Sequence, residues 1–501
     1  MPSYSLLTFG CQMNQHDSER MEEVLKRAGY APAEDVERAD LVLLNTCSVR
    51  EKAEQKLRSE VGRLGVLKAR RPELLIGVAG CVAQQEGERL VKRMPQIDLL
   101  IGPDNIPELP GLLRELEGGA PAQVRATFDL DSPRFLSLDA ELPRARRVSS
   151  FVTIMKGCDE RCSFCIVPTT RGPERYRPSA EILEECAALV AQGTREITLL
   201  GQTVDSYLDP SGELPALSGA EEAPFTRLPS GETAKRRGAG IHADESEFPA
   251  LLRAICERVP KLARVRYTSP HPRHLTPALI QAHRDLPQLV RHVHMPVQSG
   301  SDRVLRRMIR RYSVDEYLER TDALKRAVPG LSLSTDIIVG FPGETEDDFE
   351  QTLELVRRVG FVGVFGFKYS ERPGTPALKL EDDVPEVEKS RRLSALFELS
   401  ERLRREHLQR LIGGEERVLV EGLGRTGGYT GRTERNEIVH FGSNTDVLGE
   451  LVEVRITGAF KHSLQAELVD EARRAALPLP QDPAEVATPV DKPGRVSLPV
   501  V

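Results

Sequence analysis

Three cysteines lie close together in the stretch CDERCSFC. Cys158, Cys162 and Cys165 directly follow a strand-like run, and Gly157 and Pro168 flank them in an expected loop. Three thiolates at this spacing suit a soft metal ion or an iron–sulfur cluster. Zinc normally takes a fourth Cys or His ligand, and none lies nearby. The spacing therefore favours a cluster with one open iron over a zinc site or a redox-active thiol.

Three further cysteines are spread out, and each ends a similar apolar run. Cys11, Cys47 and Cys81 follow SYSLLTFG, DLVLLNT and ELLIGVAG, with spacings of 36 and 34 residues. These spacings form no linear ligand motif, so chance placement at strand ends stays open here. The last two cysteines, Cys186 and Cys256, stand in helix-like patterns where a small buried hydrophobe is the better interpretation.

Residues 1–125 alternate the three apolar runs with helix-like stretches such as DSERMEEVLKRAGY. Alternating elements of this length predict a parallel sheet covered by helices. Ligands bind to such sheets at the carboxyl ends of the strands, near a switch in strand order. The three spread cysteines occupy that position, so we expect the fold to bring their thiols to one edge.

A linker rich in Pro, Gly and acidic residues, about 103–147, leads to a second alternating segment, about 148–378. Six strand–helix units predict a β/α barrel, full or partial, and we take it as a partial (β/α)6 barrel. Such barrels carry their chemistry on the loops at the carboxyl ends of the strands. Residues 209–247 interrupt one unit with a long polar stretch, which we expect to be a flexible insertion on the loop face.

Three segments complete an α/β chain of several domains. Residues 385–411 predict a charged helix. Five short strands in residues 413–470 fit a small five-stranded β-barrel of the OB type. The tail, 471–501, has six prolines and little apolar pattern, so we expect it to be disordered.

Composition excludes several classes of protein. The 501 residues carry 69 Lys and Arg against 76 Asp and Glu, and the net charge of −7 excludes binding to nucleic acid by bulk positive charge. The absence of Trp and 5% aromatic residues argue against a single-strand binder built on stacking. The N-terminus lacks the features of a signal peptide, and the longest nearly apolar run is about half a membrane span. We therefore expect a cytoplasmic protein without a membrane segment.

CDERCSFC is similar to the cluster motif of radical S-adenosylmethionine enzymes, and the chain more narrowly resembles their methylthiotransferase family, in the branch that modifies tRNA. The stretches that carry the resemblance extend over about 1–470: FGCQMNQHDSE, LLNTCSVREKAE, GVAGCVAQ, MKGCDERCSFCIVPTTRGPE, LLGQTV, HMPVQSGSDRVLRRM, TDIIVGFPGET and GRTERNEIVHF. Nearly the whole chain is covered, except the insertion and the tail.

The resemblance implies two [4Fe-4S] clusters, each with an open iron. The cysteines of CDERCSFC would hold the first, whose open iron is chelated by S-adenosylmethionine. One electron would convert this cofactor to methionine and a 5′-deoxyadenosyl radical, which takes hydrogen from carbon 2 of an adenine. The three spread cysteines would hold the second cluster, where sulfur is methylated by another S-adenosylmethionine and transferred to that carbon.

The resemblance also implies the substrate and the partners. The substrate would be N6-isopentenyladenosine beside the anticodon of a tRNA. The other partners would be an electron donor and a sulfur donor, with no membrane, and we expect a monomer.

Five further residues are candidates for binding S-adenosylmethionine, and for each a turn or barrel-support role stays open. Gly201 and Gln202 end the barrel's second strand, where the wider superfamily often has a short polar motif for the cofactor's amino group. Gln298 and Ser299 end another strand. Gly340 lies in DIIVGFPGET, where close backbone approach to adenosine favours glycine.

Four histidines near strand ends offer other polar groups: His271, His274, His292 and His294. A metal site among them is the less favoured interpretation, because polar residues on the loop face of a barrel need no metal.

Two arginine groups suggest RNA contacts. Helical spacing in DRVLRRMIRRY puts Arg303, Arg307 and Arg310 on one side, suited to RNA phosphates or to a solvated face. The C-terminal module resembles the TRAM domain of tRNA-modifying enzymes. Its six basic and ten acidic residues give a net charge of −4, which differs from a basic RNA clamp, but arginines gather around GRTERN and predict a local patch.

Two alternative functions remain. The same chemistry would serve to methylthiolate an aspartate of a ribosomal protein, which the acidic C-terminal module mildly favours, whereas CQMNQHDSE and NTCSVR favour tRNA. The other alternative is an RNA-binding protein with structural iron–sulfur clusters. Two three-cysteine sets oppose it, since a structural site is usually closed by a fourth ligand.

Overall fold

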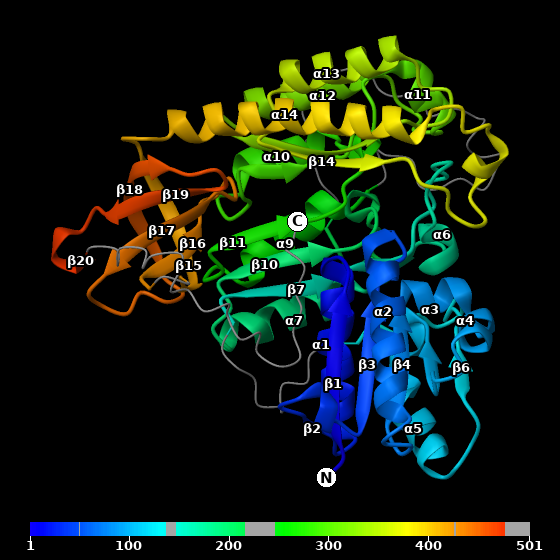
Figure 1. Cartoon of the computed structure of the whole chain (residues 1–501). Coiled ribbons are helices and arrows are strands. Elements are labelled where there is room, and N and C mark those ends of the chain that lie inside the picture. Colours follow the sequence, from blue (N-terminus) through cyan, green and yellow to red (C-terminus); the bar gives the residue numbers. More distant parts are fainter. Residues whose placement is uncertain (50, 137–146, 216–245, 425–426, 476–501) are drawn as a thin grey trace, which may run out of the picture.

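The computed structural model describes residues 1–49, 51–136, 147–215, 246–424 and 427–475. Two α/β parts and a small β part follow one another along the chain, and the colours of Figure 1 separate them from blue to red. Among the described helices, none combines the length and apolar character that crossing a membrane requires.

The first part is a six-stranded sheet in which every neighbouring pair of strands is parallel, in the order β2-β1-β3-β4-β5-β6. The strands are β1 (Ser3–Phe9), β2 (Ala31–Pro32), β3 (Leu41–Thr46), β4 (Leu75–Gly80), β5 (Leu99–Ile101) and β6 (Gln123–Arg125). The helices are α1 (Gln12–Arg27), α2 (Glu51–Lys68), α3 (Cys81–Glu86), α4 (Glu88–Arg93) and α5 (Leu109–Glu117). The predicted parallel sheet with covering helices is confirmed.

The sheet is buried on both faces. In β3, Val42 and Leu44 pack into the hydrophobic cluster on one face, whereas Leu41 and Leu43 pack into the cluster on the other. A parallel strand covered by helices on both sides has no polar face, which explains the continuous apolar run in its sequence.

The second part contains six parallel strands arranged as two three-stranded sheets, β11-β10-β7 and β12-β13-β14. An isolated bridge between Val265 of β11 and Leu289, in the segment that leads into β12, connects the sheets into the predicted partial barrel. The strands are β7 (Ser149–Thr153), β10 (Glu196–Leu200), β11 (Arg264–Tyr267), β12 (His292–His294), β13 (Ser332–Val339) and β14 (Gly363–Lys368), with a short hairpin of β8 (Met155–Lys156) and β9 (Arg175–Tyr176).

Helices cover the outside of this barrel: α7 (Ser179–Ala191), α9 (Phe248–Arg258), α10 (Pro277–Asp285), α11 (Asp302–Arg307), α12 (Val314–Ala327) and α13 (Glu346–Val359). The short helix α6 (Val167–Thr170) lies instead at the end of the barrel, against α3. Of the expected insertion, residues 216–245 lie outside the described residues. Its first part is held at the barrel, because Asp209 Oδ2 accepts a hydrogen bond from Ser179 Oγ at 2.7 Å.

The third part is a closed five-stranded barrel, as predicted. Its strands are β15 (Glu415–Leu423), β16 (Tyr429–Arg432), β17 (Ile438–Ser443), β18 (Leu451–Ala459) and β19 (Ser463–Leu468), and pairing of β16 with β17 closes the ring. A further strand, β20 (Arg474–Ala475), pairs with β17. This corrects the expected start of the disordered tail at 471, since residues 471–475 are ordered by that pairing; residues 476–501 lie outside the described part.

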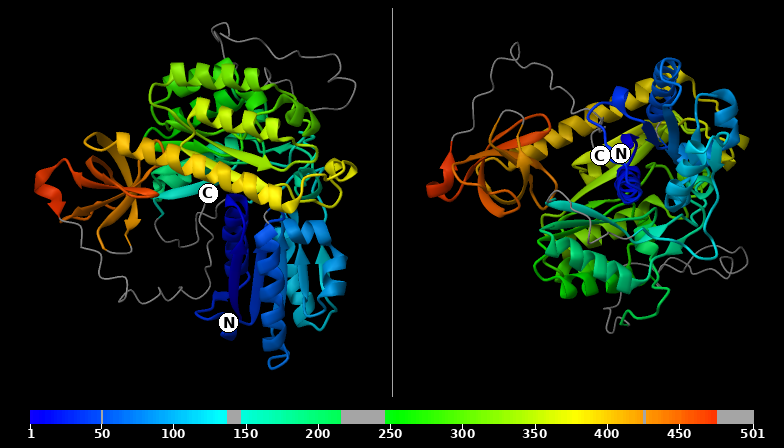
Figure 2. Two further views of the ribbon diagram at one scale, coloured as in Figure 1. Left: turned by 45° about the horizontal axis from the view of Figure 1, so that its top comes forward. Right: turned by 90° about the horizontal axis from the view of Figure 1, so that it is seen from below.

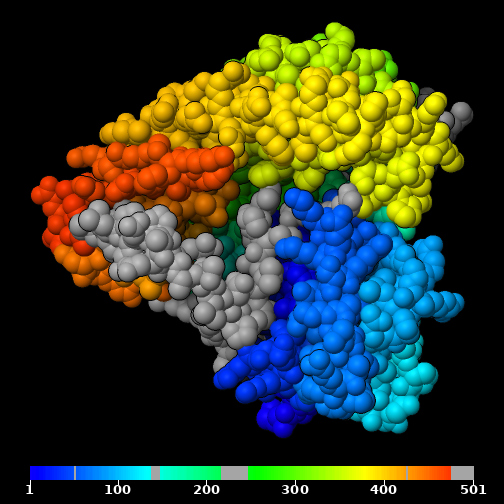
Figure 3. Space-filling model, in the orientation of Figure 1, coloured from blue at the N-terminus to red at the C-terminus, as the bar shows by residue number. Residues whose placement is uncertain are grey.

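A long helix, α14 (Glu386–Arg410), runs along β14 and reaches the small barrel (Figures 1 and 2). The small barrel packs where the central strands begin, because Arg264 at the start of β11 donates to backbone carbonyls of β15 and β16. The N-terminal sheet packs where the central strands end, through contact of α3 with α6. Figure 3 shows the three parts around a hollow on this face of the molecule.

Candidate active site

The N-terminal cysteines lie at one edge of the first sheet. Cys11 immediately precedes α1, Cys47 follows β3, and Cys81 begins α3 directly after β4. Strands β1, β3 and β4 are neighbours, and their last residues are paired in register. Because parallel strands that end at one level present their following loops side by side, the fold brings these distant residues together.

Each of these thiols has a polar neighbour. Cys11 Sγ donates to Asn14 Oδ1 at 3.3 Å, and the backbone N–H of Val49 donates to Cys47 Sγ at 3.3 Å. A hydrogen bond with Cys47 lowers the pKa of Cys11 to about 6, whereas burial raises the pKa of Cys81. Three thiols gathered in this way are suited to binding a metal, which replaces their protons.

The second set of cysteines occupies the loop between β8 and α6. Cys158 Sγ lies 3.0 Å from Thr203 Oγ1, and Arg310 Nη1 donates to Cys162 Sγ at 3.3 Å. The backbone N–H of Cys165 donates to the carbonyl of Cys162 at 3.1 Å, which curls the loop around the thiols. Burial raises the pKa of Cys165 to about 12, so a metal must displace its proton for the sulfur to become a thiolate.

One short segment contacts both sets. The carbonyl of Gly172 accepts a hydrogen bond from the backbone N–H of Cys158 at 3.1 Å. The adjacent Arg171 donates from Nε to Cys81 Sγ at 3.3 Å and from Nη2 to Asp17 Oδ2 at 2.6 Å. Since neighbouring residues touch one ligand set each, both sites lie next to the segment 171–172.

Buried ion pairs hold the two domains in this arrangement. Asp104 accepts from Lys156 Nζ at 3.0 Å and from Arg175 Nη1 at 2.5 Å, across the interface between sheet and barrel. Arg20 of α1 pairs with Glu185 of α7 at 2.7 Å. Burial acts to raise the pKa of Asp104, but its two cationic partners outweigh burial and lower it to about 2. Sequence reasoning missed these pairs because their members are far apart along the chain.

Gly201 and Gln202 lie at the start of the loop after β10, beside the loop that carries Cys158, Cys162 and Cys165, which we call the cluster loop. Gln202 Oε1 accepts the backbone N–H of Gly157 at 2.5 Å and so supports the residue before Cys158. A side chain at Gly201 would place its Cβ 2.4 Å from Met155 Cγ, so packing alone requires glycine there.

The other three candidates lie on the opposite half of the barrel. Gln298 is buried in a left-handed backbone conformation with φ of 73°, which is uncommon for a non-glycine residue. Ser299 Oγ accepts the backbone N–H of Ser301 at 3.2 Å. Gly340 has φ of 68°, and a Cβ there would lie 2.3 Å from Lys389 Cγ, so contact with α14 is enough to explain glycine.

The arginine face expected in DRVLRRMIRRY does not form. Helix α11 ends at Arg307, whose Nε donates to the carbonyl of Pro342 at 2.8 Å. Arg303 is ion-paired with Asp348, and Arg310 is buried beneath the cluster loop. The interpretation as a phosphate-binding helix face is therefore wrong, because these side chains serve contacts within the protein.

The expected basic patch in GRTERN is likewise used within the protein. Arg432 pairs with Glu421 at 3.3 Å and Arg435 with Glu437 at 3.1 Å. Backbone carbonyls of the same loop accept hydrogen bonds from Arg264 of the central barrel. The third arginine of the patch lies outside the described residues. This loop is thus a contact between the two barrels rather than a free basic surface.

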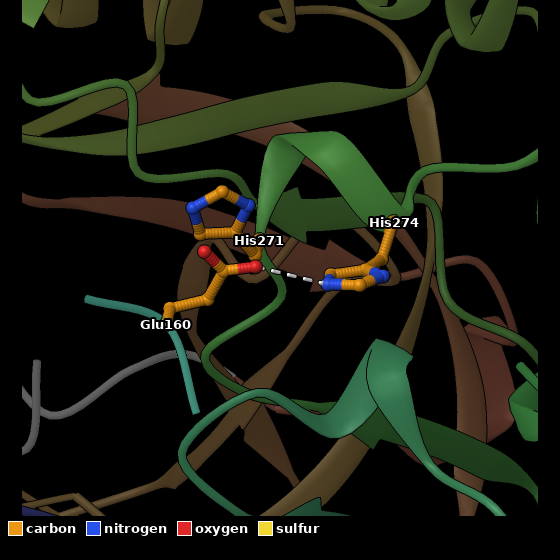
Figure 4. A group of neighbouring side chains, drawn as sticks. All are labelled: Glu160, His271 and His274. Atoms are coloured by element: carbon orange, nitrogen blue, oxygen red, sulfur yellow. Dashed lines mark hydrogen bonds and ion pairs between the residues drawn. The ribbon is translucent and has the colours of Figure 1, made fainter. Parts of the chain in front are cut away.

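Figure 4 shows a buried group of Glu160, His271 and His274, whose potential ligand atoms all lie within 4.8 Å of one another. Glu160 Oε1 accepts hydrogen bonds from His274 Nε2 and Arg273 Nη1, both at 3.3 Å. Glu160 Oε2 and His271 Nε2 have no hydrogen-bond partner in the part of the chain that the structure describes. The guanidinium of Arg273 already balances the charge of the Glu160 carboxylate, and this guanidinium would repel a divalent cation. The group therefore fits a structural contact that fixes the cluster loop better than it fits a metal site.

The two cysteine sets fit one kind of cofactor. The remaining cysteines, Cys186 and Cys256, pack in the hydrophobic core of the central barrel and leave no fourth thiolate for either set. Three sulfur ligands suit a [4Fe-4S] cluster in which one iron stays open for another ligand.

Comparison with known protein families divides the chain into three matches. The Uncharacterized protein family UPF0004 matches residues 3–102, the Radical SAM superfamily matches residues 152–356, and the TRAM domain matches residues 409–469. These matches follow the N-terminal sheet, the central barrel and the small barrel.

Individual relatives extend over almost the full length. A tRNA-2-methylthio-N(6)-dimethylallyladenosine synthase from Sorangium cellulosum is 61% identical, with 100% of this chain and 99% of the relative covered. Its namesake from Nitrosospira multiformis is 44% identical over 92% of each chain. Among solved structures, a radical S-adenosylmethionine methyltransferase from Kitasatospora setae, with cobalamin and a [4Fe-4S] cluster, has a TM-score of 0.50. It is 14% identical and covers 75% of this chain and 77% of its own, so it shows a likeness of fold alone.

Proposed function

The chain belongs to the tRNA-2-methylthio-N(6)-dimethylallyladenosine synthase family of radical S-adenosylmethionine enzymes, and we propose that it methylthiolates carbon 2 of N6-isopentenyladenosine beside the anticodon of tRNA. The observation that carries the proposal is the segment 171–172, which contacts one cysteine of each set. Two neighbouring sites suit a reaction that must activate a carbon and deliver sulfur to the same atom.

Membership of the radical S-adenosylmethionine family implies a [4Fe-4S] cluster and S-adenosylmethionine as cofactors. We assign the first cluster to Cys158, Cys162 and Cys165, and propose a second for the N-terminal set. When bound, these groups supply the electron that cleaves S-adenosylmethionine and an iron that carries sulfur. The chain's residues hold the thiolates, bury them from water and keep the two sites in register through the interface ion pairs.

Five residues are proposed to line the S-adenosylmethionine site: Gly201, Gln202, Gln298, Ser299 and Gly340. Gln202 has the best support, since it bonds to the residue before Cys158. The left-handed backbone of Gln298 also supports a functional position, because strained residues gather at active sites. Gly201, Ser299 and Gly340 each make contacts that explain the residue without a cofactor.

The proposal includes a donor for each half of the chemistry. Cleavage of S-adenosylmethionine must be started by an electron, and each turnover consumes a sulfur atom, so the enzyme needs an electron donor and a sulfur donor. We place it in the cytoplasm, with tRNA as substrate, and propose that it acts as a monomer. Between the two methylthiolation targets, the relatives favour tRNA over a ribosomal protein, because their names describe a tRNA product.

The experiment that tests the proposal is anaerobic reconstitution with iron and sulfide, followed by incubation with dithionite, S-adenosylmethionine and isopentenylated tRNA. Nucleosides from the digested tRNA are then analysed by mass spectrometry. The expected product is the 2-methylthio derivative of N6-isopentenyladenosine, with 5′-deoxyadenosine formed beside it.

Two other results would change the conclusion. Formation of 5′-deoxyadenosine without a modified nucleoside would keep the radical chemistry and remove tRNA as the substrate, and the ribosomal protein would be tested next. Reconstituted protein that binds iron but leaves S-adenosylmethionine intact would support a structural role for the clusters. A parallel reaction with unmodified tRNA shows whether the isopentenyl group is required.

A further inference from the structure

Each cysteine set receives a hydrogen bond from one buried arginine. Arg310 Nη1 lies 3.3 Å from Cys162 Sγ, and Arg171 Nε lies 3.3 Å from Cys81 Sγ. Both side chains come from distant parts of the chain, and each arginine is only 5% exposed to solvent. The two sites thus share one kind of neighbour, a guanidinium that donates to a ligand sulfur.

The two arginines differ in how their charges are balanced. Arg171 is paired with the carboxylate of Asp17 at 2.6 Å. Arg310 donates from Nε to Tyr312 Oη at 2.9 Å and from Nη2 to the carbonyl of Pro296 at 3.0 Å. None of these described partners of Arg310 is a carboxylate. The pair at the N-terminal site is therefore neutral, whereas a whole positive charge stands beside Cys162.

The backbone around Arg310 is strained on both sides. Ile309 and Arg311 have φ of 58° and 56°, a left-handed conformation that is especially unfavourable for a β-branched residue. The same loop is bonded to the cluster loop, because the backbone N–H of Ser163 donates to the carbonyl of Met308 at 2.9 Å. Such strain persists only where the surrounding structure enforces it, and it gathers at functional sites.

We propose that Arg310 raises the reduction potential of the iron–sulfur cluster held by Cys158, Cys162 and Cys165, and that Asp17 cancels the corresponding effect of Arg171 at the N-terminal site. The inference rests on the proposed function, which supplies the two clusters. Arg310 and Asp17 act through the cluster ligands, so they are positioning residues rather than catalytic ones.

The physical reason is the charge that reduction adds. One electron from a reductant enters the cluster, and no bond to the protein is made or broken. The reduced cluster carries one more negative charge, so a nearby buried cation stabilises it more than the oxidised form. Hydrogen bonds to ligand sulfurs act in the same direction, and both effects are strong where water is excluded. The neutral pair of Arg171 and Asp17 supplies the hydrogen bond without the net charge.

The test is an anaerobic redox titration with dithionite, followed by electron paramagnetic resonance of the reduced cluster. The full chain is used in two backgrounds, in which all three cysteines of one set are replaced by Ala so that one signal remains. In the first background, which retains Cys158, Cys162 and Cys165, Arg310→Gln should shift the midpoint potential to more negative values. Arg310→Lys, which retains the charge, is the matched control and should stay closer to the parent.

The second background, which retains Cys11, Cys47 and Cys81, provides a test with a nearly isosteric change. Asp17→Asn leaves Arg171 without its carboxylate, so the midpoint potential of the N-terminal cluster should shift to less negative values. This variant decides the charge argument even if Arg310→Gln fails to fold or to hold iron. Asp17→Glu retains the negative charge and should leave the potential near that of the parent.

Several results would overturn the proposal. An unchanged potential in Arg310→Gln with its full iron content would remove the role of that charge. Equal shifts in Arg310→Gln and Arg310→Lys would assign the effect to the geometry of the hydrogen bonds instead. An unchanged potential in Asp17→Asn would contradict charge balance at the second site. A lack of iron in a background without further substitution would contradict the proposed function, before any potential is compared.

Discussion

The neighbours of each sulfur separate the candidate ligands from the other cysteines. Cys162 and Cys81 receive hydrogen bonds from guanidinium groups, and Cys158 lies against a threonine hydroxyl. Cys186 and Cys256 instead pack among Ile, Leu and Val side chains of the barrel core. Polar groups that donate to sulfur stabilise a thiolate once a metal has displaced its proton, whereas the apolar surroundings of Cys186 and Cys256 offer no such donors, so the two classes differ in chemistry as well as in position.

Replacing single cysteines should separate the two halves of the reaction. Cys162→Ala should abolish formation of 5′-deoxyadenosine, because the site that cleaves S-adenosylmethionine loses a ligand. Cys47→Ala should abolish methylthiolation while 5′-deoxyadenosine still forms. Liquid chromatography of the reaction measures both products, and iron analysis should show that each variant has lost about half of its iron.

The matched control is Cys256→Ala, which removes a buried thiol outside both sets and should retain full iron and both products. Its cost is a small cavity, on the order of 1 kcal/mol. Methylthiolation that persists in Cys47→Ala would contradict the assignment of a second cluster to the N-terminal cysteines.

Asp104 should make the interface between sheet and barrel sensitive to acid. Its folded-state pKa of about 2 lies below that of an unfolded aspartate, so its stabilising contribution is present above about pH 4 and lost as the pH falls toward 2. Asp104→Asn should lower the free energy of unfolding by about 2 kcal/mol at pH 6, through weaker bonds to Lys156 and Arg175. At pH 3 the difference from wild type should shrink. Urea unfolding of the metal-free chain at the two pH values measures both quantities.

An exposed aspartate gives the comparison. Asp322 lies 3.9 Å from Arg358 on the surface, and Asp322→Asn should change the free energy of unfolding by less than about 0.5 kcal/mol. A difference between Asp104→Asn and wild type that is as large at pH 3 as at pH 6 would show that charge at Asp104 is not what stabilises the interface.

At the scale of elements, the entry to the cluster loop depends on one glycine. Gly157 connects β8 to Cys158 with φ of 80°, and a Cβ there would lie 1.9 Å from the carbonyl oxygen of Pro173. Gly157→Ala should displace the loop and lower the iron bound by Cys158, Cys162 and Cys165, as measured by iron analysis and absorption spectroscopy.

Gly212 is a matched control because it has a similar φ of 66° but no atom within 4 Å of an added Cβ. Both substitutions cost about 1 kcal/mol for the left-handed backbone, whereas only the first adds a clash. Equal iron content in Gly157→Ala and Gly212→Ala would show that the loop adapts to the side chain.

Much of the element order could be predicted because the pattern is local. Apolar runs of β1, β3 and β4 end at cysteines, and parallel strands place their carboxyl ends together, so their convergence follows from topology. The six barrel strands were predicted in the same way. The short strand β20 was missed, because two residues in a Pro-rich context carry no period, and pairing with β17 provides the order.

The polar environment of the site could not be predicted in this way. Arg310 and Cys162 are 148 residues apart, and Arg171 and Cys81 are 90 apart. Helical spacing assigned Arg310 to a surface face, but α11 ends at Arg307 and the left-handed residues that follow turn the chain inward. A helical pattern in sequence does not reveal such a turn, because it depends on contacts with the cluster loop.

At the scale of the whole molecule, the central barrel is covered differently at its two ends. The N-terminal sheet closes the end that carries the cluster loop, and the small barrel closes the end where the strands begin. The small barrel and the cysteine sites therefore do not share a surface on the barrel. Binding of RNA by the small barrel and chemistry at the cysteines should be separable by mutation.

Arg264 is the residue whose replacement tests this separation of RNA binding from the chemistry. It is 2% exposed and donates to the carbonyls of Arg432 at 2.7 Å, Arg417 at 2.9 Å and Thr433 at 3.2 Å. Burial lowers its pKa to about 10, which still leaves it charged at neutral pH. Arg264→Met keeps the length of the side chain, removes the donors and should weaken attachment of the small barrel by about 3 kcal/mol.

If the small barrel positions tRNA, Arg264→Met should weaken tRNA binding by roughly tenfold or more, the equivalent of about 1.4 kcal/mol of lost contact. Formation of 5′-deoxyadenosine without tRNA should stay unchanged, because the cysteine sites lie at the other end of the barrel. Filter binding measures the first quantity and chromatography measures the second. The control is Arg253→Met, which removes a half-exposed ion pair with Asp285.

Limited proteolysis after α14 should release the small barrel more readily in Arg264→Met. Release of the small barrel without loss of tRNA affinity would place the RNA-binding surface on the sheet and the central barrel.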